Sequence, residues 1–236
     1  MKSLLRDIAP KMEGDRSQFG EGSIISEILR RLGIVEGVAV EFGAGDGVEL
    51  SNTRHLWDSP AKPWAGVLIE ADPARYCALA DNTRGFPVAH FEAVVTPDNV
   101  NSYVPYVGTQ VVSIDVDGAD FDILCAMDAR PAALCVEHHP MIPAHVSMIG
   151  GQDIGCSALA LKEWADENDY RVVALTHCNT IMVPSSYLPF FDDIDLDFLH
   201  MFDPSGVTWV LSNVKTGDYG IHGPWPFGRG EETTRG

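Results

Sequence analysis

Carboxylates that could bind a metal ion or take up a proton stand at two places in the chain. Ile114-Asp115-Val116-Asp117-Gly118-Ala119-Asp120 follows an apolar run, and Glu137 ends a second one. Carboxylate oxygens are the ligands that Mg²⁺ or Mn²⁺ prefers, so Asp115, Asp117 and Glu137 are candidate metal ligands. The alternative interpretation is that these acids only cap helices.

Two histidines, His138 and His139, directly follow Glu137. Imidazole titrates near neutrality, which makes either ring a candidate general base, with Asp115 as a further catalytic candidate. In the structural alternative, the two rings satisfy one another and the backbone.

A glycine-rich turn after a strand-like run indicates a ligand site earlier in the chain. Val38-Ala39-Val40-Glu41-Phe42-Gly43-Ala44-Gly45-Asp46-Gly47 passes from apolar residues through an acid into three spaced glycines. Such a loop lets the backbone turn sharply and approach a ligand closely. The dinucleotide pattern G-x-G-x-x-G requires a third glycine where Val48 stands, so the match to NAD proteins is partial. A turn without any ligand is the alternative.

A second acid ends the next apolar run, Val67-Leu68-Ile69-Glu70-Ala71-Asp72-Pro73. In nucleotide-binding α/β folds, an acid at the end of the second strand accepts hydrogen bonds from ribose hydroxyls. Glu70 is placed for that role. It could instead cap the helix that follows Pro73, but Asp72 is nearer to the capping position.

Alternating strand and helix patterns predict the elements that position these groups. A helix is expected over residues 23–32, with Ser23 as its N-cap and Gly33 as its stop. Further helices are expected over residues 50–57, 74–80, 120–124 and 157–168. Strands are expected over residues 38–42, 67–70, 88–95, 111–115, 132–137, 171–175 and 179–183. This order predicts an α/β, Rossmann-like, doubly wound and mostly parallel seven-stranded sheet with helices on both faces.

Composition narrows the classes of partner. The chain of 236 residues carries a formal net charge of −18, which disfavours nucleic acid because phosphate backbones are bound by Lys and Arg. Five scattered cysteines indicate reduced thiols, and no apolar run is long enough for a membrane span, so we expect a cytoplasmic protein. We expect a small-molecule substrate, and a homo-oligomer is compatible with the sequence.

One domain is expected, with a helical lead-in (1–36), a core (37–183) and an extension (184–236) that could cover a substrate.

Together these motifs resemble those of class I S-adenosyl-L-methionine (SAM) methyltransferases, and within them the FkbM-type group. The resemblance spans residues 17–183 and adds Ser17-Gln18 with Glu21-Gly22, Ser51-Asn52-Thr53 and Asn179-Thr180-Ile181-Met182-Val183 to the stretches above. It implies methyl transfer to a small molecule, most simply to a hydroxyl of a sugar or natural-product scaffold. It also implies residues that bind SAM: Glu41, Gly43, Gly45, Asn52, Glu70, Ala71, Glu92, Ala93 and Asp115.

Other functions remain open at this point. The acceptor could be a nitrogen atom. Asp115-Val116-Asp117-Gly118 also resembles the nucleophile loop of haloacid-dehalogenase-type phosphohydrolases, although Ala119 stands where a threonine is expected. Two further alternatives are a glycosyltransferase that holds a metal-bound nucleotide sugar at the same D-x-D, and a non-catalytic module that binds SAM or a nucleotide.

Overall fold

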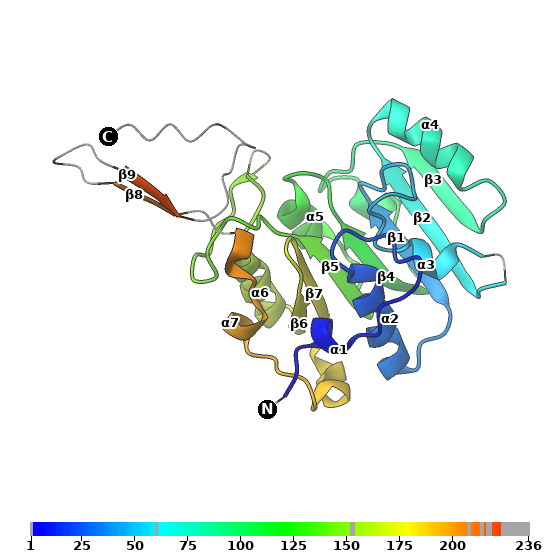
Figure 1. Cartoon of the computed structure of the whole chain (residues 1–236). Coiled ribbons are helices and arrows are strands. Elements are labelled where there is room, and N and C mark those ends of the chain that lie inside the picture. The colour runs from blue at the N-terminus through cyan, green and yellow to red at the C-terminus, as the bar shows by residue number, and fades with distance from the viewer. Residues whose placement is uncertain are drawn as a thin grey trace.

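A seven-stranded sheet runs through the computed structural model, which describes residues 2–59, 61–151, 154–206, 209–212, 215 and 219–222 (Figure 1). Its strands form where the sequence predicts them, with limits that differ by a few residues. They are β1 (Gly37–Phe42), β2 (Trp64–Glu70), β3 (Val88–Glu92), β4 (Thr109–Ile114), β5 (Ala133–Glu137), β6 (Tyr170–Leu175) and β7 (Asn179–Pro184).

The strand order β3-β2-β1-β4-β5-β7-β6 reverses direction at β1. Its first five positions follow the Rossmann order, in which ligands bind where the order reverses. β1 pairs in parallel with both β2 and β4, whereas β7 is antiparallel to β5 and β6. The expectation of a mostly parallel, seven-stranded, Rossmann-like sheet is confirmed, and β7 is the exception to the parallel arrangement.

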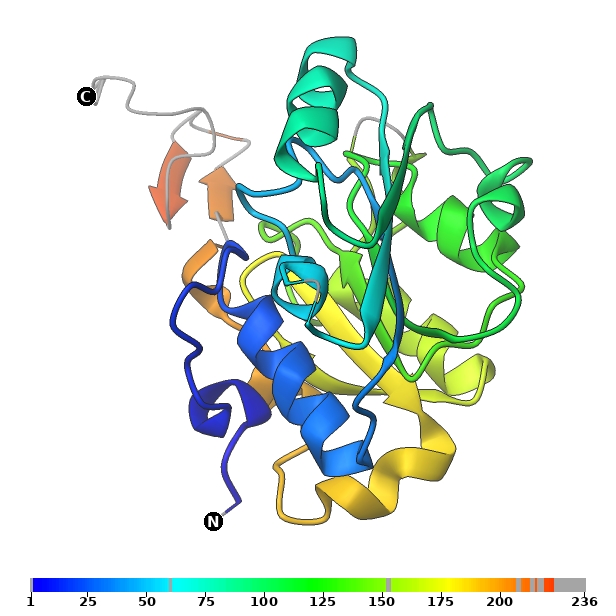
Figure 2. The same cartoon turned by 90° about the vertical axis from the view of Figure 1, so that its right-hand side faces the viewer.

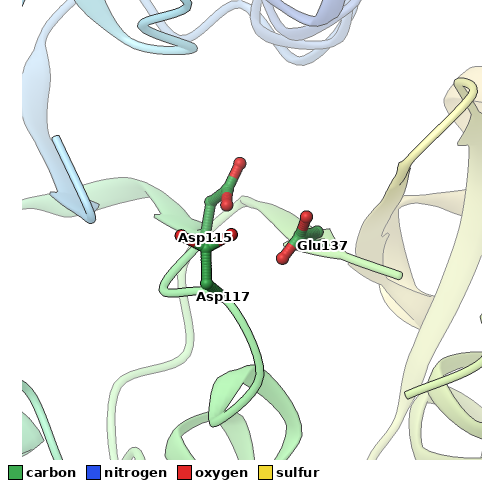
Figure 3. Close-up of side chains that lie close together, drawn as sticks. All are labelled: Asp115, Asp117 and Glu137. Atoms are coloured by element: carbon green, nitrogen blue, oxygen red, sulfur yellow. The ribbon is translucent and has the colours of Figure 1, made fainter. Parts of the chain in front are cut away.

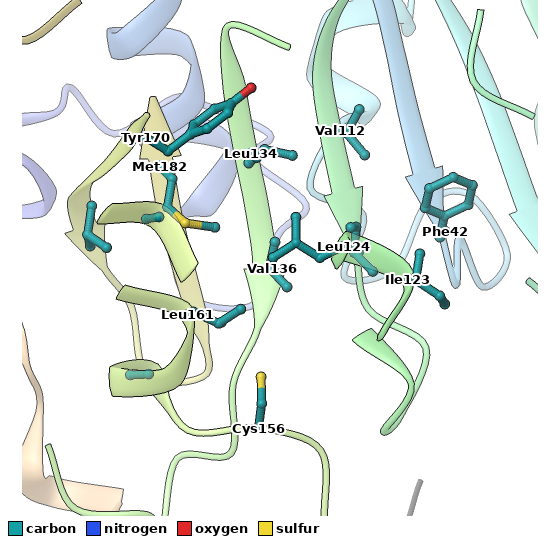
Figure 4. Packing of buried hydrophobic residues seen from close by; sticks show 14 of the residues in the cluster. Phe42, Val112, Ile123, Leu124, Leu134, Val136, Cys156, Leu161, Tyr170 and Met182 are labelled. Atoms are coloured by element: carbon teal, nitrogen blue, oxygen red, sulfur yellow. The ribbon is translucent and has the colours of Figure 1, made fainter. Parts of the chain in front are cut away.

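Helices cover both faces of the sheet because successive strand residues point to opposite sides (Figure 2). Ala39 belongs to one apolar cluster, while Val40 and Phe42 belong to the other. The Ala39 face is covered by α1 (Leu5–Ile8), α2 (Glu21–Leu32), α3 (Arg54–Trp57), α4 (Pro73–Asn82) and the 3₁₀ segment η3 (Ser185–Phe191). The opposite face is covered by η1 (Val100–Ser102), α5 (Asp120–Ala126), α6 (Ala158–Glu167) and α7 (Phe198–Met201). Figure 4 shows part of this second cluster.

The start of α2 differs from the sequence prediction, and Ser23 as its N-cap is wrong. The helix begins at Glu21 after Gly20, whose φ of 89° turns the chain. Asp15 supplies the capping acceptor instead, because its Oδ2 accepts from the Ser23 backbone N–H at 2.7 Å and from Ser23 Oγ at 2.5 Å. A carboxylate from the preceding loop therefore satisfies the first turn, while Gly33 ends the helix as predicted.

The crossover helix expected over residues 50–57 is also shorter than predicted. Only α3 is helical, because residues 51–53 are bonded to the buried carboxylate of Glu41 rather than to the next helical turn.

The extension after residue 184 contributes η3, α7, the 3₁₀ segment η4 (Pro204–Gly206), and an antiparallel pair, β8 (Trp209–Ser212) and β9 (Tyr219–His222). Trp225 and Phe227, two aromatic residues of the predicted substrate cover, lie outside the described residues. All five cysteines are free. None of the helices in the described part of the chain is both long and apolar enough to cross a membrane.

Candidate functional site

A cleft of about 860 Å³ opens at the carboxyl ends of β1, β2, β4 and β5. Most of the residues that the sequence analysis nominated line it together: Glu41, Gly43, Gly45, Asn52, Glu70, Ala71, Ala93, Asp115, Asp117 and Glu137. Its size lies within the range of small-molecule and cofactor pockets. Glu92 is exposed at the end of β3 and does not belong to this lining.

The glycine loop after β1 is held against the ends of its two neighbouring strands. Gly43 has a φ of 74°, and a Cβ there would lie 1.6 Å from the backbone oxygen of Asp115, so only glycine fits. Gly45 has a φ of 57°, but nothing lies within 4 Å of the position of a Cβ. The loop is thus packed on one side at Gly43 and open to the cleft at Gly45.

Glu70 connects this loop to the start of α4. One carboxylate oxygen accepts from the Gly45 N–H at 2.7 Å, and the other accepts from the Asp72 N–H at 2.7 Å. Asp72 itself caps α4, since its Oδ1 accepts from the N–H groups of Ala74 and Arg75. Glu70 is therefore not the helix cap, and its buried carboxylate lines the cleft.

Glu41 organises the segment that follows the glycine loop. Its Oε2 accepts from Ser51 Oγ at 2.7 Å and from Thr53 Oγ1 at 2.6 Å, and its Oε1 accepts from the Asn52 N–H at 2.7 Å. Burial raises the pKa of Glu41, while these hydrogen bonds act in the opposite direction. The side chain of Asn52 donates to Ser113 Oγ at 3.0 Å, which ties this wall of the cleft to β4.

Three carboxylates converge where β4 and β5 end (Figure 3). Asp115, Asp117 and Glu137 each have an oxygen within 4.8 Å of the others. Burial, reinforced by the neighbouring carboxylates, raises the pKa of Asp115 to about 7 and that of Glu137 to about 8. Oxygen ligands of one Mg²⁺ stand about 2.1 Å from the ion, so small rotations would bring all three carboxylates to a shared cation. The donor set fits a hard divalent cation.

Asp120 shapes the loop that carries two of these acids. Its Oδ1 accepts from the Val116 N–H at 2.7 Å and its Oδ2 from the Gly118 N–H at 2.8 Å. Asp117, between them, has a φ of 58°, a conformation that costs free energy in most non-glycine residues. The loop is therefore constrained to bring Asp117 beside Asp115.

The two histidines line a second cavity of about 410 Å³, which shares Asp117 and Glu137 with the larger cleft. His138 is buried, with Nδ1 at 3.0 Å from Thr180 Oγ1, and burial lowers its pKa to about 3. His139 is half-buried, its Nδ1 accepts from the Met141 N–H at 3.3 Å, and burial lowers its pKa. Neither ring belongs to the lining of the larger cleft.

Gln18 and Leu50 are among the cleft residues that were not nominated from the sequence. Leu50 has a φ of 60°, and its segment forms an isolated parallel bridge with Ser17. Ser17-Gln18 belongs to a motif that the sequence analysis noted, so a signal for Gln18 existed. Leu50 carried none, because a strained backbone leaves no mark on residue type.

Comparisons with known proteins show similarity in fold and none in sequence family. No protein-family model matches this chain, and no curated protein matches its sequence. A candidate O-methyltransferase from Klebsiella pneumoniae is similar in structure with a TM-score of 0.50 and 15% identity, over 76% of this chain and 86% of that one. The likeness is one of fold.

Two SAM-dependent methyltransferases solved with S-adenosyl-L-homocysteine are also similar at 12% identity and a TM-score of 0.40. The one from Thiobacillus denitrificans matches over 72% of this chain and 70% of its own. The one from Geobacter sulfurreducens matches over 73% of this chain and 74% of its own.

Proposed function

We propose that this protein is a SAM-dependent methyltransferase, of the FkbM type or a close relative, that methylates a hydroxyl group of a small molecule. The observation that carries the proposal is the buried carboxylate of Glu70, which binds the open glycine loop at Gly45 and faces a cleft of about 860 Å³. In this proposal residues 1–236 act as one methyltransferase domain, and the extension 184–236 covers the acceptor.

The residues of the cleft suit the parts of this cofactor. Glu70 and Ala71 would hold the ribose and Ala93 the adenine, while Gly43, Gly45 and Asn52 would lie beside the methionine part. When bound, SAM supplies an electrophilic methyl group. Glu41 would act mainly through Ser51, Asn52 and Thr53, because these three already bond to its carboxylate.

In this proposal, the acid cluster activates the hydroxyl group of the acceptor. Asp115, Asp117 and Glu137 would hold Mg²⁺ or Mn²⁺, and such an ion lowers the pKa of a bound hydroxyl. His139 would orient the acceptor. His138 is the weaker candidate for a base, because it is buried and its Nδ1 is bonded to Thr180. An amine acceptor would need less activation, so nitrogen methylation is the second candidate.

Calorimetric titration with S-adenosyl-L-homocysteine tests the cofactor proposal. We expect micromolar binding to the wild type and at least about tenfold weaker binding to Glu70→Gln, which corresponds to roughly 1.4 kcal/mol. Glu92→Gln is the matched comparison, since Glu92 pairs with Glu70 in the β2–β3 register but lies outside the cleft lining. We expect its affinity to be unchanged.

Absence of binding to the wild-type protein, with and without MnCl₂, would overturn the methyltransferase proposal. Hydrolysis of phosphate esters that is lost in Asp115→Asn would then favour the phosphohydrolase alternative. Equal losses in Glu70→Gln and Glu92→Gln would instead place the nucleoside differently at the end of the sheet.

A further inference from the structure

We propose that the cavity of about 410 Å³ beside the acid cluster binds the body of the methyl acceptor and selects uncharged or cationic molecules over anions. This inference rests on the proposed function for the reaction, but the binding site itself can be tested separately. The cavity and the larger cleft lie on either side of the acid cluster. They share Asp117 and Glu137, and their other lining residues differ.

The position of the cavity follows from the residues that it shares with the larger cleft. Asp117 and Glu137 line both, so the two spaces meet at these carboxylates. A molecule seated in the smaller cavity would present one end to the acid cluster and, across it, to the cleft of the glycine loop. That is the arrangement a methyl acceptor requires, because the reacting atoms of two bound molecules must meet at close range.

His139 gives the cavity a hydrogen-bond donor. Its Nδ1 accepts from the Met141 N–H, so the neutral ring carries its proton on Nε2. No hydrogen bond from this Nε2 to another described residue is formed. The ring can therefore donate from Nε2 to a carbonyl, ether or hydroxyl oxygen of a bound molecule.

The remaining walls determine the kind of molecule. Pro140, Met141 and Ile154 give apolar contact, and no Lys or Arg of the described chain lines the cavity. The charged groups facing it are the carboxyl side chains of Asp117, Asp120 and Glu137. Phosphorylated and carboxylated acceptors are therefore disfavoured, whereas sugars, phenols and amines of compact size are favoured.

Met141 is a reporter inside the cavity, so methyl NMR with ¹³C-labelled methionine can test the site. Two matched sets serve as probes: tyramine, 4-methylphenol and 4-hydroxyphenylacetate, and glucosamine, glucose and glucuronate. Each set runs from cation through neutral molecule to anion at similar size. Probes are used at about 10 mM, because fragments of this size bind with Kd values on the order of 1 mM. The Met141 signal is assigned with Met141→Leu.

We expect the neutral and cationic members of at least one set to shift the Met141 methyl signal, and the matched anion to bind at least about tenfold more weakly. Ile154→Trp, which fills the cavity, should abolish these shifts. Ile149→Trp is the control, because Ile149 is exposed, lies nearby and does not line the cavity. His139→Leu should weaken binding several-fold. Affinity for S-adenosyl-L-homocysteine should be unchanged in all three variants.

Failure of this inference is distinguishable from failure of the proposed function. If S-adenosyl-L-homocysteine binds but none of the six probes shifts Met141, or the anions bind as well as the cations, the acceptor cavity is overturned and the methyltransferase proposal stands. If the probes bind as expected but the cofactor product does not, the cavity is a small-molecule site and its role in methyl transfer is overturned.

Discussion

His55 is a residue whose side chain works against the stability of the fold. Both of its ring nitrogens are buried and bond to no described residue, and burial lowers its pKa to about 4. A ring that is neutral when folded and protonated when unfolded makes stability fall as the pH drops from about 6.5 toward 4. With these pKa values, the free energy of unfolding should decrease by about 2 kcal/mol between pH 8 and pH 5 through this residue.

Replacement of His55 by Leu removes both unpaired nitrogens and leaves an apolar side chain of similar volume, so we expect equal or higher stability at pH 8. Between pH 8 and pH 5, the free energy of unfolding should decrease by about 2 kcal/mol less in the variant than in the wild type. Urea unfolding at the two pH values measures both effects. An unchanged pH dependence would show that a partner for the ring exists in solution.

The acid cluster has the opposite dependence on pH. The pKa values of Asp115 and Glu137 are raised, so the folded protein binds protons more tightly than the unfolded chain, and stability falls as the pH rises from about 4 to about 8. A divalent cation competes with those protons. We therefore expect Mn²⁺ to raise the melting temperature more at pH 8 than at pH 6. At a concentration of 100 times its Kd, it should raise the free energy of unfolding by about 2.7 kcal/mol.

Glu137→Gln and Asp117→Asn should abolish this stabilisation by Mn²⁺ in thermal unfolding. Asp122→Asn is the matched control, because Asp122 is an exposed acid of the same cleft that does not belong to the cluster. Equal stabilisation of all four proteins would indicate nonspecific binding to the acidic surface and would contradict the metal proposal.

At the scale of the element, two glycines of the loop after β1 have different roles. Gly43 is required for the packing of the fold, whereas Gly45 is open to the cleft and is expected to affect ligand binding. Gly43→Ala would bring a Cβ to 1.6 Å from the Asp115 backbone, so β1 and β4 would have to move apart, and we expect a loss of at least about 3 kcal/mol. Gly45→Ala meets nothing within 4 Å and should cost only about 1–2 kcal/mol for its positive φ. Chemical denaturation checks both values. The Gly45 variant should fold and yet bind S-adenosyl-L-homocysteine more weakly, whereas undiminished affinity would place the cofactor away from this loop.

Strained backbone at Leu50 and Asp169 offers a matched pair. Both are non-glycine residues with positive φ, of 60° and 58°, but only Leu50 lines the cleft. We expect Leu50→Gly and Asp169→Gly each to raise stability by about 0.5–1 kcal/mol by relieving strain. Only Leu50→Gly should weaken binding of S-adenosyl-L-homocysteine, measured by calorimetry. Equal affinities would show that the strain at Leu50 has no role in the cleft.

The elements were the most predictable part of the molecule. Runs such as Val111-Val112-Ser113-Ile114 are typical of buried strands, and an acid or glycine after such a run marks the carboxyl end where ligands bind. Periodicity could not show that Asp15 caps α2, because that acceptor comes from a loop outside the helix. Nor could it separate the histidines from the larger cleft, since adjacency to Glu137 in sequence does not determine which cavity a ring faces.

At the scale of the whole molecule, the net charge of −18 should make stability depend on salt. Repulsion among the acids is stronger in the compact state than in the extended chain, and salt screens it. We expect 0.5 M NaCl, at which the screening length is only about 3–8 Å, to raise the melting temperature at pH 8 and to do so less at pH 5, where some acids are protonated. Scanning calorimetry measures this. A decrease at pH 8 would show that attractive ion pairs outweigh the repulsion.

The strand order also determines when the site can exist during synthesis. β1 lies between β2, which follows it closely in the chain, and β4, which follows only after β3. The glycine loop therefore leaves the ribosome well before Asp115 and Glu137, and its packing partner at Gly43 is not yet made. Because a domain generally folds as a unit, β1 has no partner on its β4 side until β4 has been made, and that strand edge stays unpaired in the meantime. A ligand that contacts both the glycine loop and the acid cluster could therefore assist folding only after β5 has emerged.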